Sequence, residues 1–163
     1  MLQIPPTQTI WQALDEVKDP EIPVVSVVEM GIVRAVEVSG ENITVTMTPT
    51  FSGCPALHVM KSDIVGKLGE LGFEHVEVKT ILSPPWSTDW ITAAAKDKLR
   101  DYGITPPAPA GDDGLIQLEL SPSQCPRCGS FDTRTRNTFG PTLCKSIHTC
   151  NSCREPFEAF KSL

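Results

Sequence analysis

Four cysteines near the end of the chain have the spacing of a metal site. Cys125 and Cys128 form one C-x-x-C pair, and Cys150 and Cys153 form a second pair. Each pair makes a tight turn that directs two sulfurs at one point, and two pairs complete the tetrahedral four-thiolate shell that zinc prefers. A hairpin across the 21 intervening residues would bring the pairs together. We therefore expect one structural zinc ion in a C-terminal zinc ribbon.

A fifth cysteine, Cys54, has a different setting. It follows Gly53 and precedes Pro55, a residue suited to the first position of a helix. We expect Cys54 to be the N-cap of that helix, where the helix dipole would lower the thiol pKa. The thiolate could then bind iron or a cluster, act as a nucleophile with His58 as base, or simply cap the helix. The sequence offers no oxyanion site or third partner, so we assign no catalytic residue.

The sixth cysteine, Cys144, is expected to lie outside the zinc site. In an extended strand it would be about 20 Å from Cys150, too far to share its metal. We expect a small buried residue of the ribbon sheet. His148, on the same face of the strand, is expected to be a packed or surface histidine and not a ligand.

Apolar periodicity predicts the elements that position these cysteines. Apolar residues at helical spacing predict helices, and alternating β-branched residues predict strands. The order α-β-β-α-β-α favours an α+β domain, in which helices cover one face of a small mixed sheet, followed by the four-cysteine ribbon. The predicted elements are helices at 9–18, 55–71 and 88–102, strands at 31–38, 42–48 and 75–82, and ribbon strands at 131–138 and 143–149.

Charge and composition divide the chain into two domains. Residues 1–120 carry 8 Lys and Arg against 17 Asp and Glu, whereas residues 121–163 carry 6 against 3. The change coincides with a segment rich in proline and glycine at residues 105–114, which is typical of a linker. We therefore predict a first domain over residues 1–111 and a zinc-ribbon domain over residues 112–163.

Two classes of partner are not expected. The chain begins without the basic start and apolar run of a signal peptide, and no stretch approaches the roughly 18 apolar residues that cross a membrane. Six cysteines without an export signal favour reduced thiols in the cytoplasm. A zinc ion with four thiolates carries a charge of −2, which leaves the basic tail at only about +1. We therefore expect neither membrane nor nucleic-acid binding, and a protein partner instead.

Several motifs resemble those of known families. The first domain resembles the SufT-like domain of iron-sulfur assembly factors over about 100 residues, through DPEIP at 19–23, VSVVEMGIV at 25–33, SGCP at 52–55 and PPWSTDW at 84–90. The ribbon adds FGPTLCK at 139–145 and EPF at 155–157. With both parts, the chain resembles the PaaD family, also called PaaJ, of bacterial phenylacetate degradation.

The resemblance implies an accessory role without intrinsic catalytic activity. Such proteins assist the maturation of the multicomponent monooxygenase that forms the 1,2-epoxide of phenylacetyl-CoA. The implied partners are its oxygenase and reductase components and the iron-sulfur assembly machinery. Cys54, with Asp19 and Glu21, would hold a transient iron-sulfur cluster or iron; the alternative for the two acids is a surface role at the end of a helix. The alternative for the whole chain is a non-catalytic structural subunit that bridges oxygenase components.

Overall fold

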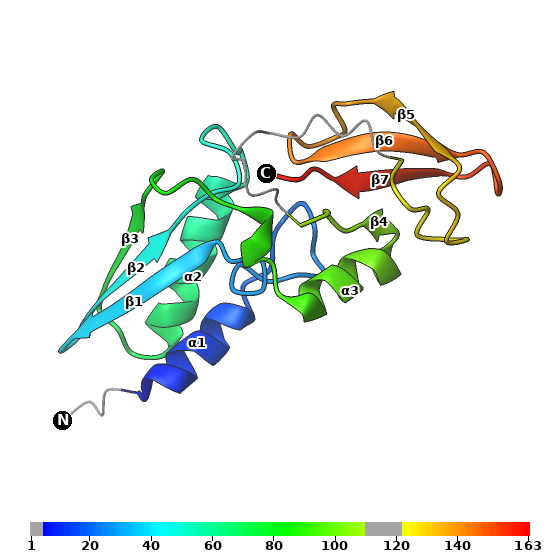
Figure 1. Cartoon of the computed structure of the whole chain (residues 1–163). Coiled ribbons are helices and arrows are strands. Elements are labelled where there is room, and N and C mark those ends of the chain that lie inside the picture. Colours follow the sequence, from blue (N-terminus) through cyan, green and yellow to red (C-terminus); the bar gives the residue numbers. More distant parts are fainter. Residues whose placement is uncertain (1–4, 110–121) are drawn as a thin grey trace. The chain divides into compact units, whose positions relative to one another are not determined.

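The computed structural model describes residues 5–109 and 122–163. The chain divides into two compact units, Met1–Trp86 and Ser87–Leu163, which are described separately (Figure 1). The predicted boundary between residues 111 and 112 lies outside the described residues. None of the described helices is long and apolar enough to cross a membrane.

The first unit contains a small mixed sheet, as expected. Its strands are β1 (Val33–Ser39), β2 (Asn42–Met47) and β3 (His75–Thr80), in the order β1-β2-β3. β1 and β2 form an antiparallel hairpin, which turns at Gly40 with a φ of 61°. β2 and β3 run parallel, because a helix connects them.

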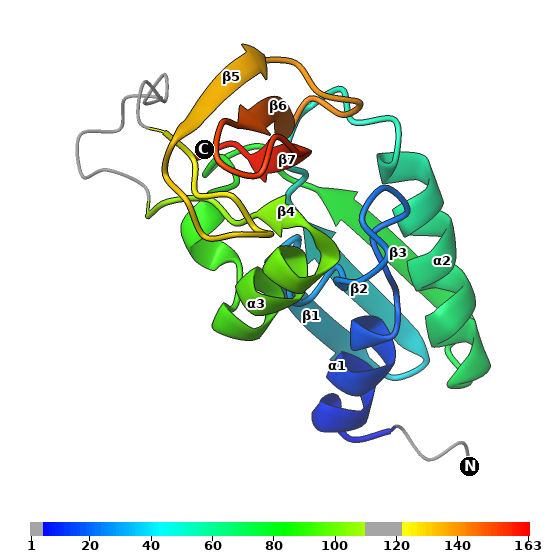
Figure 2. The same ribbon diagram turned by 90° about the vertical axis from the view of Figure 1, so that its right-hand side faces the viewer.

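Two helices, α1 (Thr7–Asp15) and α2 (Leu57–Glu70), lie on one face of this sheet (Figure 2). The alternation of β2 turns Ile43, Val45 and Met47 toward them, and these three side chains are at most 1% exposed. The start predicted for the first helix, residue 9, is wrong. α1 begins two residues earlier, and the backbone carbonyl of Pro6 accepts the Thr9 N–H at 2.9 Å.

Two loops of the first unit carry the candidate site residues. Residues 48–56 connect β2 to α2, so this loop leaves the carboxyl end of a parallel strand. Residues 16–32 connect α1 to β1 and are fixed by reciprocal hydrogen bonds: the Ser26 N–H donates to Glu29 Oε2, and the Glu29 N–H donates to Ser26 Oγ, both at 3.0 Å. Trp86 Nε1 donates to the Met30 carbonyl at 2.9 Å and holds the same loop.

The second unit begins with helical turns. The helix predicted at residues 88–102 is interrupted and forms a 3₁₀ turn, η1 (Thr88–Trp90), and α3 (Ala93–Tyr102). Thr92 begins α3 as its N-cap, since its Oγ1 accepts the Ala95 N–H at 3.1 Å. α3 belongs to the second unit.

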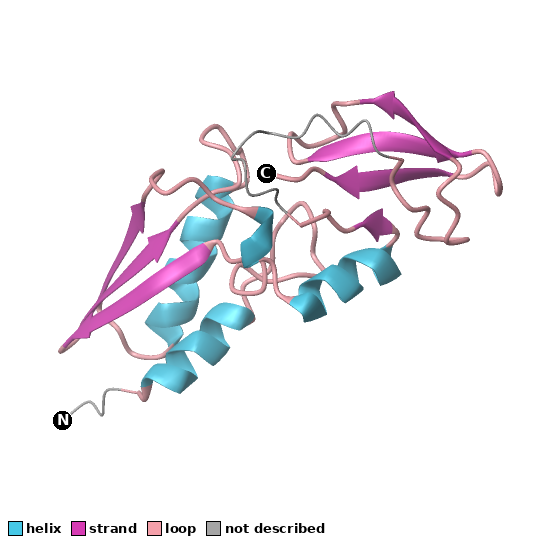
Figure 3. Cartoon of the chain, viewed as in Figure 1, coloured by secondary structure: helices cyan, strands magenta, loops and turns pink. Residues whose placement is uncertain are grey.

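A four-stranded sheet follows (Figure 3). The predicted ribbon hairpin is present as an antiparallel pair, and two further strands, which the sequence analysis did not predict, extend it. The order is β4-β7-β6-β5. The strands are β4 (Ile104–Thr105), β5 (Thr133–Asn137), β6 (Lys145–Cys150) and β7 (Pro156–Phe160).

Candidate functional site

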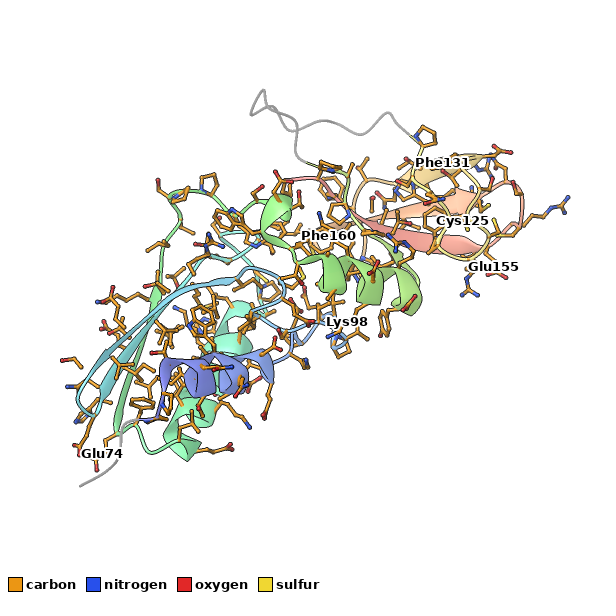
Figure 4. The ribbon with its side chains drawn as sticks, turned by 60° about the horizontal axis from the view of Figure 1, so that its bottom comes forward. Glu74, Lys98, Cys125, Phe131, Glu155 and Phe160 are labelled. Carbon is orange, nitrogen blue, oxygen red and sulfur yellow. The ribbon has the colours of Figure 1, made fainter. Side chains whose placement is uncertain are left out.

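The four cysteines of the ribbon converge as the spacing predicts. The sulfurs of Cys125, Cys128, Cys150 and Cys153 all lie within 4.8 Å of one another. Two of the separations are 3.7 Å, between the sulfurs of Cys125 and Cys153, and 3.5 Å, between those of Cys128 and Cys150. Zinc–sulfur bonds of about 2.3 Å in a tetrahedron place sulfurs about 3.8 Å apart. The donor set and its dimensions therefore fit a zinc ion. Cys125 lies inside the ribbon (Figure 4).

The two knuckles have equivalent backbone geometry. The residue after the second cysteine of each pair has a left-handed conformation, with φ of 74° at Gly129 and 64° at Arg154. This conformation is easy for glycine and costs an arginine about 1–2 kcal/mol. In the second knuckle the Cys153 N–H donates to the Cys150 sulfur at 3.5 Å. Arg154 therefore has a strained backbone in the turn that directs a backbone N–H at the sulfur cluster.

Polar side chains join one knuckle to the other, which the sequence analysis missed. Ser130 Oγ and Ser152 Oγ are 2.8 Å apart. Asn151 Nδ2 donates to Asp132 Oδ1 at 2.7 Å, and the Asn151 backbone N–H donates to the Asp132 carbonyl at 2.8 Å. The two serines and Asn151 lie within or just after the two C-x-x-C pairs. Polar residues at these positions could have been recognised from the sequence as contacts between the knuckles.

The cluster does not present four equivalent thiols. The Cys153 N–H favours the thiolate of Cys150 and lowers its pKa to about 6. At Cys153, the Glu155 N–H favours the thiolate, but burial and the neighbouring sulfurs outweigh it and raise the pKa to about 12. Thiolates this close repel one another, so a cation is needed for all four to be ionised.

Cys144 lies outside the cluster, as expected. Its side chain is buried, and its sulfur lies 3.2 Å from Thr142 Oγ1. His148 is also buried; its Nε2 is 2.8 Å from Ser146 Oγ, and its ring stacks on Phe157. His148 is therefore a packed histidine of the sheet.

Cys54 is not the N-cap of α2, which corrects the expectation from sequence. The helix begins at Leu57 and its N-cap is Ala56, so Cys54 lies two residues further out, in the loop. Pro55 and Ala56 form a turn that delays the helix, in which the Leu57 N–H donates to the Cys54 carbonyl at 3.2 Å. The Cys54 side chain is half-buried, and His58 is exposed on α2.

Asp19 and Glu21 come from the other loop of the first unit and lie near Cys54. Their carboxylates act on the Cys54 thiol electrostatically and raise its pKa. Asp19 also shapes the chain: its Oδ1 accepts the N–H groups of Glu21 at 2.7 Å and of Ile22 at 3.1 Å. The side chain of Asp19 thus fixes the turn and adds negative charge near the thiol.

The expected lowering of the Cys54 pKa is wrong. Burial raises the pKa of the Cys54 thiol, the N–H of Ala56 works against this, and the charges of Glu21 and Asp19 raise it further. The amides at the start of α2 do reach the sulfur, but desolvation and two carboxylates outweigh them. A cation bound here would remove the repulsion and favour the thiolate.

Thr48 is a buried residue of the same loop that the sequence analysis did not single out. Continuing the alternation of β2 past its end would place the Thr48 side chain on the same face as Thr44 and Thr46, which are partly exposed. Instead Thr48 is 1% exposed, and its hydroxyl has no hydrogen-bond partner within the described part of the chain. The chain turns inward here, where the Thr48 N–H donates to the Ile32 carbonyl at 2.8 Å.

Comparison with known proteins identifies both parts. Residues 117–161 match the PaaD zinc beta ribbon domain, and residues 7–80 match the family described as iron-sulfur cluster assembly protein. The chain is 42% identical over 159 residues to a putative 1,2-phenylacetyl-CoA epoxidase subunit of Escherichia coli K12, covering 98% of this chain and 94% of the relative. The chain belongs to the PaaD family.

Other relatives match about half of this PaaD-family chain. The Fe-S protein maturation auxiliary factor YitW of Bacillus subtilis is 33% identical, over 55% of this chain and 88% of the relative. The auxiliary factor SufT of Staphylococcus aureus is 35% identical, over 48% and 90%. A crystal structure of a domain of unknown function, DUF59, from Bacillus anthracis aligns with a TM-score of 0.53 and 32% identity, covering 56% of this chain and 89% of that one.

Loss of one knuckle sulfur should abolish the metal site. Cys125→Ser or Cys153→Ser should reduce zinc from one ion per chain and unfold the ribbon, because structural zinc supplies about 10–16 kcal/mol in small domains. Cys144→Ser is the matched control and should retain zinc, since Cys144 lies outside the cluster. Elemental analysis and circular dichroism measure the two effects; full zinc in either knuckle variant would contradict the assignment.

The raised pKa of Cys54 should be visible in alkylation kinetics. Below its pKa, a thiol with a raised pKa has less thiolate, so the midpoint of the rate-against-pH curve should lie above that of the denatured protein. Glu21→Gln removes one repelling charge and should shift this midpoint downward. Glu37→Gln, which changes an exposed side chain of β1, should not shift it. Mass spectrometry of the Cys54 peptide gives the rates. A midpoint at or below the denatured value would refute the prediction.

Proposed function

We propose that this protein is an accessory maturation factor for the components of a phenylacetyl-CoA epoxidase. Its cargo is iron or an iron-sulfur cluster, bound transiently at Cys54. The observation that carries this proposal is that the charges of Asp19 and Glu21 act on the half-buried Cys54 thiol, within residues 7–80 that match the iron-sulfur cluster assembly family. The epoxidase as client is supported by the similarity, along nearly the whole chain, to the Escherichia coli epoxidase subunit.

The chemistry of the Cys54 loop suits transfer better than storage. Without metal, burial and the acids keep the Cys54 thiol protonated; a cation would displace that proton and gain both the thiolate and the nearby negative charge. One protein thiolate leaves the other positions of an iron centre for ligands of a donor or a recipient. Asp19 contributes charge and the shape of the turn, because its Oδ1 already accepts two backbone N–H groups.

The ribbon supplies a surface for protein partners. Its exposed cations outnumber its exposed acids, which favours docking on acidic surfaces of the oxygenase or reductase components, or of the iron-sulfur assembly machinery, in the cytoplasm. The exposed arginines are Arg127, Arg134, Arg136 and Arg154. In this arrangement zinc has a structural role in the ribbon and takes no part in cargo transfer.

A second candidate function is a structural subunit that bridges epoxidase components. The description of the Escherichia coli relative as a subunit of the epoxidase favours it. The two functions differ in timing. A maturation factor is needed while its clients acquire metal, whereas a bridging subunit is needed at every turnover.

Cells that lack this protein should therefore make epoxidase components low in iron or sulfide. Purified components that are fully loaded should gain no epoxidation activity when the protein is added. Cys54→Ser should behave like the deletion, because it removes the cargo thiol and leaves the ribbon intact.

Cys144→Ser is the control for the loss of any one thiol. Expressed in the deletion strain, it should restore the iron and sulfide content of the epoxidase components. Iron and sulfide analysis of components purified without oxygen gives the readout. Normal metal content in the deletion strain, together with activity in vitro that depends on the protein, would replace maturation by the bridging function.

A further inference from the structure

Strand β3 forms an edge of the three-stranded sheet in the described part of the chain. On its inner side, the N–H groups of His75 and Ile81 donate to carbonyls of Glu41 and Met47, at 3.5 and 2.9 Å. Backbone groups of a strand alternate in direction with a period of two. The odd-numbered residues of β3 therefore point their N–H and C=O groups at β2, and Val76, Val78 and Thr80 point theirs away from the sheet.

We propose that this edge pairs antiparallel with β3 of a second copy of the chain, which joins two sheets into one of six strands. Antiparallel hydrogen bonding requires outward-pointing residues to lie opposite each other. A two-fold axis through Val78 satisfies this condition, because Val78 then faces its own copy and Val76 faces Thr80. The self-complementary edge thus needs no other partner.

The charges of β3 select this register among its neighbours. With the axis at Val78, exposed Glu77 of each chain lies directly opposite exposed Lys79 of the other, on the face away from the helices. A shift of the axis by one residue toward Glu77 sets Glu77 against Glu77, and a shift toward Lys79 sets Lys79 against Lys79. Like charges directly opposite destabilise a sheet, whereas opposite charges contribute roughly 0.2–1 kcal/mol.

The helix beside this edge has features that packing within the chain does not explain. α2 packs on β3, and its Val65 is 43% exposed. Gly66 and Gly69 lie inside α2, where each glycine costs about 0.5–1 kcal/mol relative to alanine. A Cβ at either position would have nothing within 4 Å in the described structure. Small residues beside an exposed valine let a second α2 approach closely across the β3 pair.

A hollow of mixed polarity lies at the start of the same edge. Its lining includes Val65, Gly69, Phe73 and Val76, next to Glu74, which marks this end of the sheet in Figure 4. Val65, Phe73 and Val76 give the hollow apolar surface, and Glu74, His75 and Glu77 of the same edge line it as well. A pairing of strands this short buries little area, so the expected dimer is weak, with a micromolar Kd.

Lysine on an edge strand usually prevents pairing between sheets. Here Glu77, two residues before Lys79, changes that outcome, because the two-fold axis turns self-repulsion into two opposite-charge pairs. In the single chain Lys79 Nζ and Glu77 Oε2 form an exposed ion pair at 3.4 Å, and Glu77 Oε2 also accepts the Thr44 hydroxyl at 3.5 Å. Exposed contacts of this kind contribute little by themselves.

Charge reversal on the full-length protein tests the proposal. Analytical ultracentrifugation from micromolar to millimolar protein should show a concentration-dependent dimer. Glu77→Lys and Lys79→Glu should each raise the dimer Kd at least tenfold, because each sets like charges opposite each other. A mixture of the two variants should form a heterodimer, since the lysines of one then face the glutamates of the other. The double variant Glu77→Lys, Lys79→Glu should dimerise like the original protein.

Glu37→Lys on β1, the other edge strand, is the matched control and should leave the dimer unchanged. Circular dichroism establishes that every variant is folded. A protein that stays monomeric up to millimolar concentration overturns the proposal, as does a dimer that the single charge reversals do not weaken. Two weakened single variants that fail to associate when mixed also overturn it.

Discussion

The ribbon depends on the convergence of four sulfurs, because cysteines make up most of its buried cluster in the described residues. Its buried cluster consists of Cys125, Cys150, Phe157 and Ala159, with Cys153 packed against it. Three of these five residues belong to the candidate metal site. A module of this size is rarely stable on apolar burial alone. The exposed, arginine-rich β5 is possible because the cluster, and not that strand, holds the knuckles together.

The cysteine thiols of this chain lie in two opposite environments. In the ribbon, four thiols and backbone N–H groups surround one point, which gives a closed shell suited to permanent binding. In the first unit, a single half-buried thiol lies near two carboxylates, which attract a cation without enclosing it. A closed shell excludes exchange with another protein, whereas an open one permits it. The proposed function uses this contrast, with a structural metal in the ribbon and a transferable cargo at Cys54.

Periodicity and cysteine spacing were sufficient to predict the α+β unit, its mixed sheet and the four-cysteine cluster. They failed where the chain forms turns. Pro55 suggested a helix starting next to Cys54, but the extra turn at Ala56 moves the thiol away from the helix end. The wrong sign predicted for the Cys54 pKa shift has a different origin. Asp19 and Glu21 are more than 30 residues away from Cys54 in the sequence, and the strength of their effect on the thiol depends on tertiary structure. The motifs grouped the three residues, but they did not indicate whether the two acids raise or lower the pKa of the thiol.

The proposed two-fold axis constrains how cargo can be held. The Cys54 loop leaves the carboxyl end of β2, which runs parallel to β3, with Met47 opposite Thr80. Antiparallel pairing of β3 with its copy places the two loops at opposite ends of the joined sheet. Four residues along the strands and three strand spacings across them separate the two Met47 positions by roughly 20 Å. One small metal group cannot bridge thiols that far apart, so each chain of the dimer would bind and release its own cargo.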